Sequence, residues 1–237
     1  MGADEGEPAE RLLIDGLTLA PDVPPIHDKV RAGEIVGLAG LEGHGQEPFL
    51  EALCGLRSPL SGRLMVEAHG RWVAIASFRQ AVRCGVAYLA RDRRANGIFP
   101  SLSILDNFAL VSMDRDRSFG LIDRRKQRAR YETYQRRLSI VAPSPDRAWL
   151  ALEPRVLLLN DPTRGVDQRT REIAEHLVQR LARNEGMALV VLSTEIEELL
   201  RLCERVLVFR EQHVTARLAG AHISHDQVIG AMFGRVE

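Results

Sequence analysis

The stretch EIVGLAGLEGHGQEPFLEALCGL, residues 34–56, constrains the fold of this chain more than any other. An apolar strand pattern runs into a glycine-rich turn, and helical apolar spacing follows the turn. Gly40 and Gly45 stand in that turn, five positions apart. Where a strand, a tight turn and the N-terminus of a helix follow one another, backbone N–H groups point toward one spot and can bind an anion there.

The spacing of these glycines is that of the phosphate-binding motif G-x-x-x-x-G-K-[ST], in which the lysine contacts phosphate and the hydroxyl holds magnesium. In this chain Gln46 and Glu47 occupy those last two positions. The stretch alone leaves three interpretations open: a nucleotide site, the remains of one, or a glycine-rich turn that never bound phosphate.

Further strand and helix patterns alternate along the rest of the chain. Strand patterns cover 12–19, 62–76, 85–90, 155–162, 187–193, 205–209 and 213–218, the last as an antiparallel neighbour of 205–209. Helix patterns cover 47–56, 77–83, a stretch from about Ser103, 123–138, 168–186, 195–203 and 224–234. This alternation predicts an α/β protein with helices on both faces of a sheet, after a disordered tail over 1–10.

Composition excludes several classes of protein. The 237 residues suffice for one large domain, and 32 basic residues balance 32 acidic ones, so net charge does not indicate nucleic-acid binding. Three widely spaced cysteines favour neither a disulfide framework nor a zinc site. The sequence contains no apolar run near the roughly 20 residues that span a bilayer, and its first residues are acidic and unlike a secretory signal. Any membrane role is therefore expected to act through a partner.

The segment DRRKQRARYETYQRRL, residues 123–138, contains seven Lys or Arg residues. A solvated helix whose arginine stems cover apolar surface is one interpretation. A basic face that meets a protein partner or anionic lipid is the other. This segment contains too few aromatic residues to favour binding of single-stranded nucleic acid.

Three segments together resemble one family. EIVGLAGLEGHG (34–45), LARDRRANGIF (89–99) and LLLNDPTRGVD (157–167) resemble the motifs of ATP-binding-cassette (ABC) ATPases. The likeness is greatest to the second cassette of the duplicated ATPases of bacterial monosaccharide importers, and it covers residues 12–234 in order. It implies a P-loop NTPase fold over a single domain, 11–237, with a mainly parallel core sheet, an N-terminal antiparallel β element and a truncated helical subdomain at about 100–154.

The resemblance also implies partners and ligands. Such a cassette binds ATP and Mg²⁺ between two cassettes, either a homodimer or a heterodimer, and drives a permease served by a periplasmic sugar-binding protein. The resemblance implies no nucleic-acid partner, and it implies a cytoplasmic location on the inner face of the cell membrane.

Residue roles carry over motif by motif. The nucleotide-binding loop would comprise Gly40, Glu42, Gly43, His44, Gly45, Gln46 and Glu47. The glutamine-loop position is Arg91, and the dimer-contact loop comprises Gly165, Val166 and Asp167.

The positions next to the reacting phosphate depart from the family pattern. Asn160 stands where the family has the Walker B aspartate, Asp161 replaces the catalytic glutamate, and Thr194 replaces the switch histidine. Glu47 could bind magnesium directly, because Mg²⁺ prefers oxygen ligands. Asp161 is one methylene shorter than a glutamate, which can put a general base out of reach.

Two expected features are missing from the sequence. PSPD (143–146) joins almost directly to RAWLALEP (147–154), without the LSGGNQQK-like signature that the family places between them. Residues 17–30 contain no aromatic residue to stack on adenine.

These departures define three hypotheses. The first is a catalytically degenerate cassette of a sugar importer. The second is a non-catalytic regulatory or scaffold protein with the same fold. The third is a working ATPase in which Glu47 and Asp161 share the metal and water roles.

Overall fold

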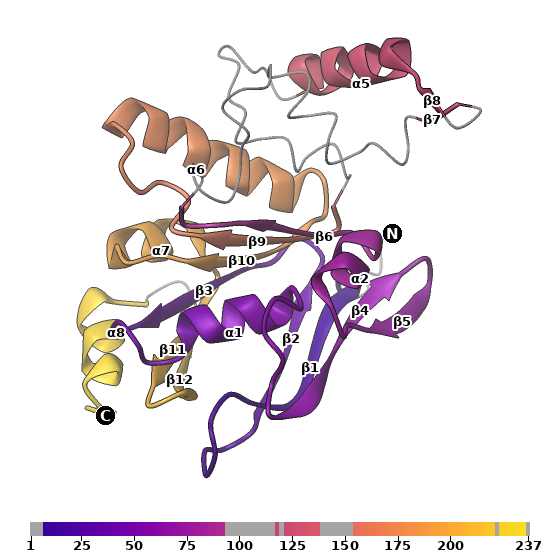
Figure 1. The fold of residues 1–237 in the computed structure, drawn as a ribbon. Coiled ribbons are helices and arrows are strands. Elements are labelled where there is room, and N and C mark those ends of the chain that lie inside the picture. The colour runs from indigo at the N-terminus through magenta and orange to yellow at the C-terminus, as the bar shows by residue number, and fades with distance from the viewer. Residues whose placement is uncertain (1–6, 93–116, 119–120, 138–153, 221–222, 236–237) are drawn as a thin grey trace, which may run out of the picture.

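The computed structural model describes residues 7–92, 117–118, 121–137, 154–220 and 223–235. Two main sheets and the helices around them form its layers (Figure 1). Among the described residues, no helix is long and apolar enough to cross a membrane.

The larger sheet carries the glycine-rich turn. Its six strands lie in the order β12–β11–β3–β10–β9–β6. Their bounds are β3 Ile35–Gly40, β6 Val86–Leu89, β9 Val156–Asn160, β10 Ala188–Leu192, β11 Arg205–Arg210 and β12 His213–Ala219. Neighbouring strands are parallel except for the antiparallel pair β11–β12. Strands β9 and β10 are buried along their whole length, as continuous apolar runs between two helical layers should be.

The second sheet is antiparallel and lies beside the first. It has the order β2–β1–β4–β5, with β1 Glu10–Thr18, β2 Ile26–Arg31, β4 Ser61–Ala68 and β5 Arg71–Ala74. The tail predicted over 1–10 is too long, because Glu10 already pairs with Arg31 and its carboxylate lies 2.5 Å from Lys29 Nζ. Residues 1–6 lie outside the described part of the chain.

Helices cover both faces of the larger sheet (Figure 1). Helix α1 (Gln46–Leu53) packs with the antiparallel sheet in one apolar cluster, and α6 (Gln168–Arg183), α7 (Ile196–Leu202) and α8 (His225–Met232) pack in a second cluster on the opposite face. Helix α2 (Phe78–Arg83) precedes β6. The turn after β3 and the end of β9 therefore lie between two apolar layers. This packing fixes the distance between the turn and the strand end.

The predicted α/β architecture, with its mainly parallel core sheet and N-terminal antiparallel element, is confirmed. The charged helix predicted over 123–138 is α5, Arg124–Arg137, which follows the small hairpin of β7 (Arg117–Ser118) and β8 (Leu121–Ile122). The helix predicted from Ser103 and the junction after PSPD lie outside the described residues. The truncation of the helical lobe therefore stays a prediction.

Candidate functional site

The glycine-rich turn closes into a tight loop before α1. Gly45 precedes the helix with φ of 110°, a conformation that side chains rarely adopt. A Cβ on Gly45 would lie 2.8 Å from Gln212 Cα, and a Cβ on Gly40 would lie 3.0 Å from the Phe209 carbonyl oxygen. Both glycines are therefore required by close backbone packing.

Gln46 fills part of the loop interior. Its side chain is only 8% exposed, and Nε2 donates to the carbonyl oxygens of Gly40 at 3.2 Å and Leu41 at 2.9 Å. The side chain thus braces the loop but brings no positive charge to it.

A hairpin turn packs against the outside of the loop. Glu211 and Gln212, between β11 and β12, both have positive φ values. The Gln212 backbone N–H donates to the His44 carbonyl at 2.9 Å, and its Nε2 donates to the Gly43 carbonyl at 2.5 Å. Local sequence pattern does not indicate this contact, because it joins two segments about 169 residues apart in the chain.

Glu47 and Asn160 meet across the start of α1 and the end of β9. Asn160 Nδ2 donates to Glu47 Oε1 at 2.9 Å and to the Tyr88 hydroxyl at 3.2 Å. Asn160 is 1% exposed, and its Oδ1 has no hydrogen-bond partner among the described residues. Burial raises the pKa of Tyr88, so its hydroxyl keeps its proton at neutral pH.

The Asp161 carboxylate is held from two sides. Asp161 Oδ1 accepts from the Thr194 backbone N–H at 2.8 Å and from its hydroxyl at 3.2 Å. Asp161 Oδ2 lies 3.0 Å from Arg91 Nε in an ion pair that lacks hydrogen-bond geometry.

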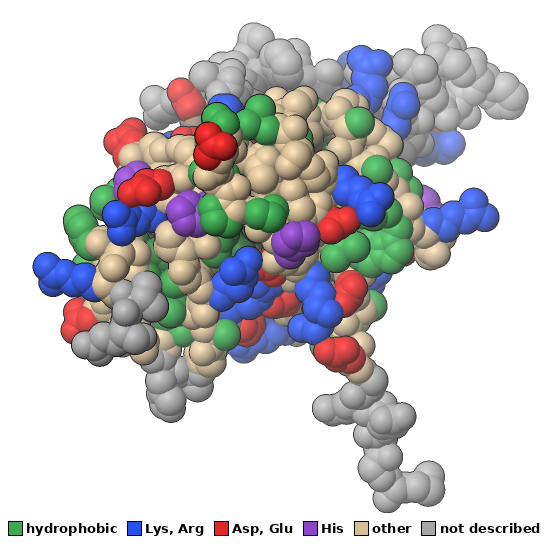
Figure 2. Space-filling model, turned by 90° about the horizontal axis from the view of Figure 1, so that it is seen from below, with side chains coloured by type: hydrophobic (Ala, Val, Ile, Leu, Met, Phe, Trp, Pro, Cys, Tyr) green, Lys and Arg blue, Asp and Glu red, His purple; other side chains and the backbone are tan. Residues whose placement is uncertain are grey.

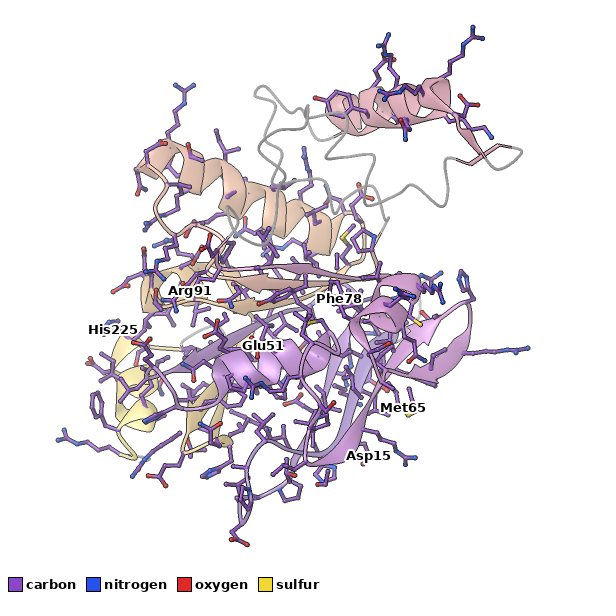
Figure 3. The ribbon with its side chains drawn as sticks, viewed as in Figure 1. Asp15, Glu51, Met65, Phe78, Arg91 and His225 are labelled. Atoms are coloured by element: carbon purple, nitrogen blue, oxygen red, sulfur yellow. The ribbon has the colours of Figure 1, made fainter. Side chains whose placement is uncertain are left out.

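Opposite charges about 4 Å apart attract by about 4 kcal/mol at an effective dielectric of 20. Asp161 is 2% exposed, so this attraction competes directly with any role in orienting water. Figure 3 labels Arg91 at this edge of the sheet.

The turn after Asp161 is anchored to α7 and leads into α6. Thr163 Oγ1 donates to Glu198 Oε1 at 2.8 Å, and both residues are buried. Asp167 caps α6 by accepting from the Thr170 backbone N–H at 3.0 Å. Between these anchors, Arg164 and Gly165 are exposed.

Glu198 should make stability depend on pH. Burial raises its pKa above the ordinary value of 4.5, so above pH 4.5 the native state keeps a proton that the unfolded state releases. The contribution of Glu198 to the free energy of unfolding therefore falls as pH rises through the folded pKa. We expect Glu198→Gln to flatten the stability profile above pH 4.5 and to be more stable than the unchanged chain at pH 8. Urea unfolding at several pH values measures this, with the exposed neighbour Glu197→Gln as control; an unchanged slope in Glu198→Gln would refute the expectation.

The structure brings most of the residues predicted from the sequence to one edge of the larger sheet. Glu47 is bonded to Asn160, and Asp161, the next residue of the chain, contacts Arg91 and Thr194. Gln46 precedes Glu47, and within the described part of the chain its side chain bonds only to carbonyls of the loop. Glu42 and Gly43 are exposed at the loop tip. Gly165, Val166 and Asp167 form a separate turn between Thr163 and α6.

Sequence reasoning missed three residues of this edge. Glu198 does not stand out among the three glutamates of EIEELL, but Tyr88 could have been suspected, because its hydroxyl is a polar group in an otherwise apolar stretch, GVAYLA. Gln212 could not, since only the folded hairpin brings it to the loop.

Comparison with solved structures identifies the fold. A dimeric ATP-binding cassette in a post-hydrolysis state with ADP and phosphate superposes with a TM-score of 0.71 at 15% identity, covering 90% of this chain and all of the other. A chain of a metal-chelate-type ABC transporter in an inward-facing conformation gives a TM-score of 0.71 at 16% identity, covering 94% of this chain and 88% of the other. The fold is that of the ABC ATPases, a branch of the P-loop NTPases.

Comparison with known sequences narrows the relationship. A ribose/galactose/methyl galactoside import ATP-binding protein of Agrobacterium fabrum is 34% identical over 93% of this chain and 47% of its own length. A ribose import ATP-binding protein of Yersinia pestis is 32% identical over 96% of this chain and 47% of its own length. No protein-family model matches the chain. The chain is homologous over nearly all of its length to these import ATP-binding proteins, and it spans about half the length of the relatives that it matches.

Proposed function

We propose that this chain is an ABC cassette of a bacterial sugar importer whose own nucleotide site does not hydrolyse ATP. It would pair with a second cassette on a permease and support transport through that contact. The importer role is supported by the sequence relatives, whose names describe ribose or galactose import.

The observation that carries the non-hydrolysing part is the engagement of Asp161. A general base or water-orienting carboxylate needs a lone pair directed at water. In this chain Thr194 occupies one oxygen of Asp161 with two hydrogen bonds, and Arg91 lies against the other. Gln46 adds no cation to offset developing phosphate charge.

The residues do fit a magnesium ion alongside bound phosphates. The Glu47 carboxylate and the unpartnered Oδ1 of Asn160 are the oxygen atoms that would hold it. Among the described residues, His, Cys, Asp and Glu form no cluster of three that could hold a metal alone, so phosphate oxygens would complete the shell. The ion would supply positive charge to the phosphates of ATP that Gln46 does not.

Contact with a second cassette is assigned to the exposed turn at Arg164–Gly165–Val166–Asp167. Thr163 and Asp167 anchor this turn at both ends, so it presents a fixed shape. On this proposal the chain lies on the inner face of the cell membrane, held by the permease, with a periplasmic sugar-binding protein acting on the far side.

Titration of the purified chain with ATP, in magnesium or in EDTA, tests whether the site binds nucleotide. Co-purification with the permease and partner cassette of the same importer tests the role in transport. Permease binding with weak or absent turnover supports the proposal. Turnover that disappears in Asp161→Asn would favour a working ATPase with unusual ligands, and binding to neither nucleotide nor permease would favour a regulatory or scaffold protein.

Restoring the loop lysine should strengthen nucleotide binding. Gln46→Lys can retain donation to the Gly40 and Leu41 carbonyls while adding one positive charge beside the phosphates. A charge-assisted hydrogen bond contributes about 1.5–3 kcal/mol, so we expect roughly tenfold or greater tightening of Mg-ATP binding. Calorimetric titration measures it, with Gln46→Met as the uncharged control. Equal affinities of the lysine and methionine variants would show that phosphates do not reach the loop.

A further inference from the structure

We propose that the exposed face of α5 binds the anionic head groups of a lipid bilayer. The face is defined by three side chains, Arg125, Lys126 and Arg128, all of them exposed. None of the three forms an ion pair within the described part of the chain. This inference rests on the proposed importer role, which places the chain beside a membrane.

The orientation of α5 follows from its two inward residues. Gln127 is 4% exposed, and Tyr131, one turn further on, packs against the apolar cluster beneath α6 and α7. Residues four apart lie on the same helix face, so 127 and 131 mark the side turned to the protein. Arg125 and Arg128 lie off this stripe, and Figure 3 shows the side chains drawn on α5 projecting from the end of the molecule.

Basic residues outnumber acidic ones along α5. Seven Lys or Arg residues stand between 123 and 138, against the two acidic residues Asp123 and Glu132. The Asp123 carboxylate accepts the backbone N–H groups of Arg125 and Lys126, which caps the helix and leaves their side chains for solvent. On the face in Figure 2, by contrast, basic and acidic side chains are interspersed. A chain with zero net charge thus carries a concentrated positive site at one end.

An anionic bilayer suits this surface better than nucleic acid does. Clusters of four to eight Lys or Arg residues on a helix are attracted to acidic lipids by about 1 kcal/mol per residue. Recognition of single-stranded nucleic acid adds aromatic stacking, but Tyr131 of α5 packs on the protein core. The flexible, charged side chains of α5 have no aromatic residue beside them to stack on a base, and they suit the mobile, anionic head groups of a bilayer.

Sedimentation with vesicles tests the inference. The purified chain is mixed at 0.1 M salt with vesicles of phosphatidylcholine alone, or with one third phosphatidylglycerol. We expect binding only to the phosphatidylglycerol vesicles, at least tenfold weakened at 0.5 M salt because salt screens exposed charges. The triple change Arg125→Gln, Lys126→Gln and Arg128→Gln should lower the partition coefficient on the order of 100-fold.

A matched triple variant controls for net charge. Arg71, Arg79 and Arg83, on β5 and α2, are also exposed, and their change to glutamine removes the same three charges. This control should bind as the unchanged chain does, and both triple variants should keep its melting temperature. Equal loss in the two triples, or no binding to acidic vesicles, would overturn the inference. Because the assay contains no permease, that failure would leave co-purification with the permease, and so the proposed function, intact.

Discussion

Phe49→Ala should lower the free energy of unfolding by about 3–5 kcal/mol, the usual cost of removing a buried phenyl ring. Phe49 is 1% exposed on α1, and its ring centroid lies 5.1 Å from that of Phe209 on β11, which is fully buried. The pair joins the helix after the glycine-rich loop to the strand before the hairpin that covers the loop. The cavity would therefore loosen both walls of the site.

Urea unfolding followed by circular dichroism measures the effect. Leu56→Ala, just beyond the same helix, is the control, because Leu56 is 51% exposed and should cost under about 1 kcal/mol. A loss below 1 kcal/mol in Phe49→Ala would mean that the ring pair does not hold α1 to the sheet.

Arg205→Met should cost a similar amount, about 3–5 kcal/mol, for a different reason. Arg205 on β11 lies 2.7 Å from Asp28 Oδ1 and 2.5 Å from Glu34 Oε1, and it donates to the Lys29 carbonyl. Asp28 belongs to the antiparallel sheet, so the guanidinium ties the two sheets together. Its removal would leave the largely buried Glu34 carboxylate without its cation and the buried Asp28 with only a half-exposed one, which is far costlier than the loss of an exposed pair.

Arg217→Met is the matched control. Arg217 also faces Asp28, at 3.4 Å, but its side chain is 49% exposed, so its pair with Asp28 should contribute less than about 1 kcal/mol. The same urea experiment compares the two variants. Equal effects would show that Arg205 acts as an ordinary surface residue, and Arg205→Met combined with Asp28→Asn should recover part of the loss.

The strands and helices could be predicted because the apolar patterns are strong. VLLLN and ALVVL read as buried strands and are buried at every position. Strand β2, IHDKVR, did not stand out by itself, because only two of its six residues, Ile26 and Val30, are buried. Its identity depends on pairing with β1, which local pattern does not show.

Candidate site positions could be named from the sequence, but the contacts between them could not. Motif positions identified Gln46, Glu47, Asn160, Asp161 and Arg91, and parallel strand order brings such positions to one sheet edge. The pairing of Arg91 with Asp161, and of Asn160 with Glu47, depends on side-chain reach across three segments. A sequence pattern contains no such distances, so the engagement of Asp161 became visible only in the fold.

The central claim, that this cassette does not hydrolyse ATP at its own site, is tested most directly by a single-turnover assay. The purified chain, in excess over radiolabelled ATP with magnesium, is followed for release of phosphate beside Asp161→Asn. We predict the same slow background for both proteins, because Thr194 and Arg91 already occupy the carboxylate. Phosphate release by the unchanged chain that is lost in Asp161→Asn would contradict the claim.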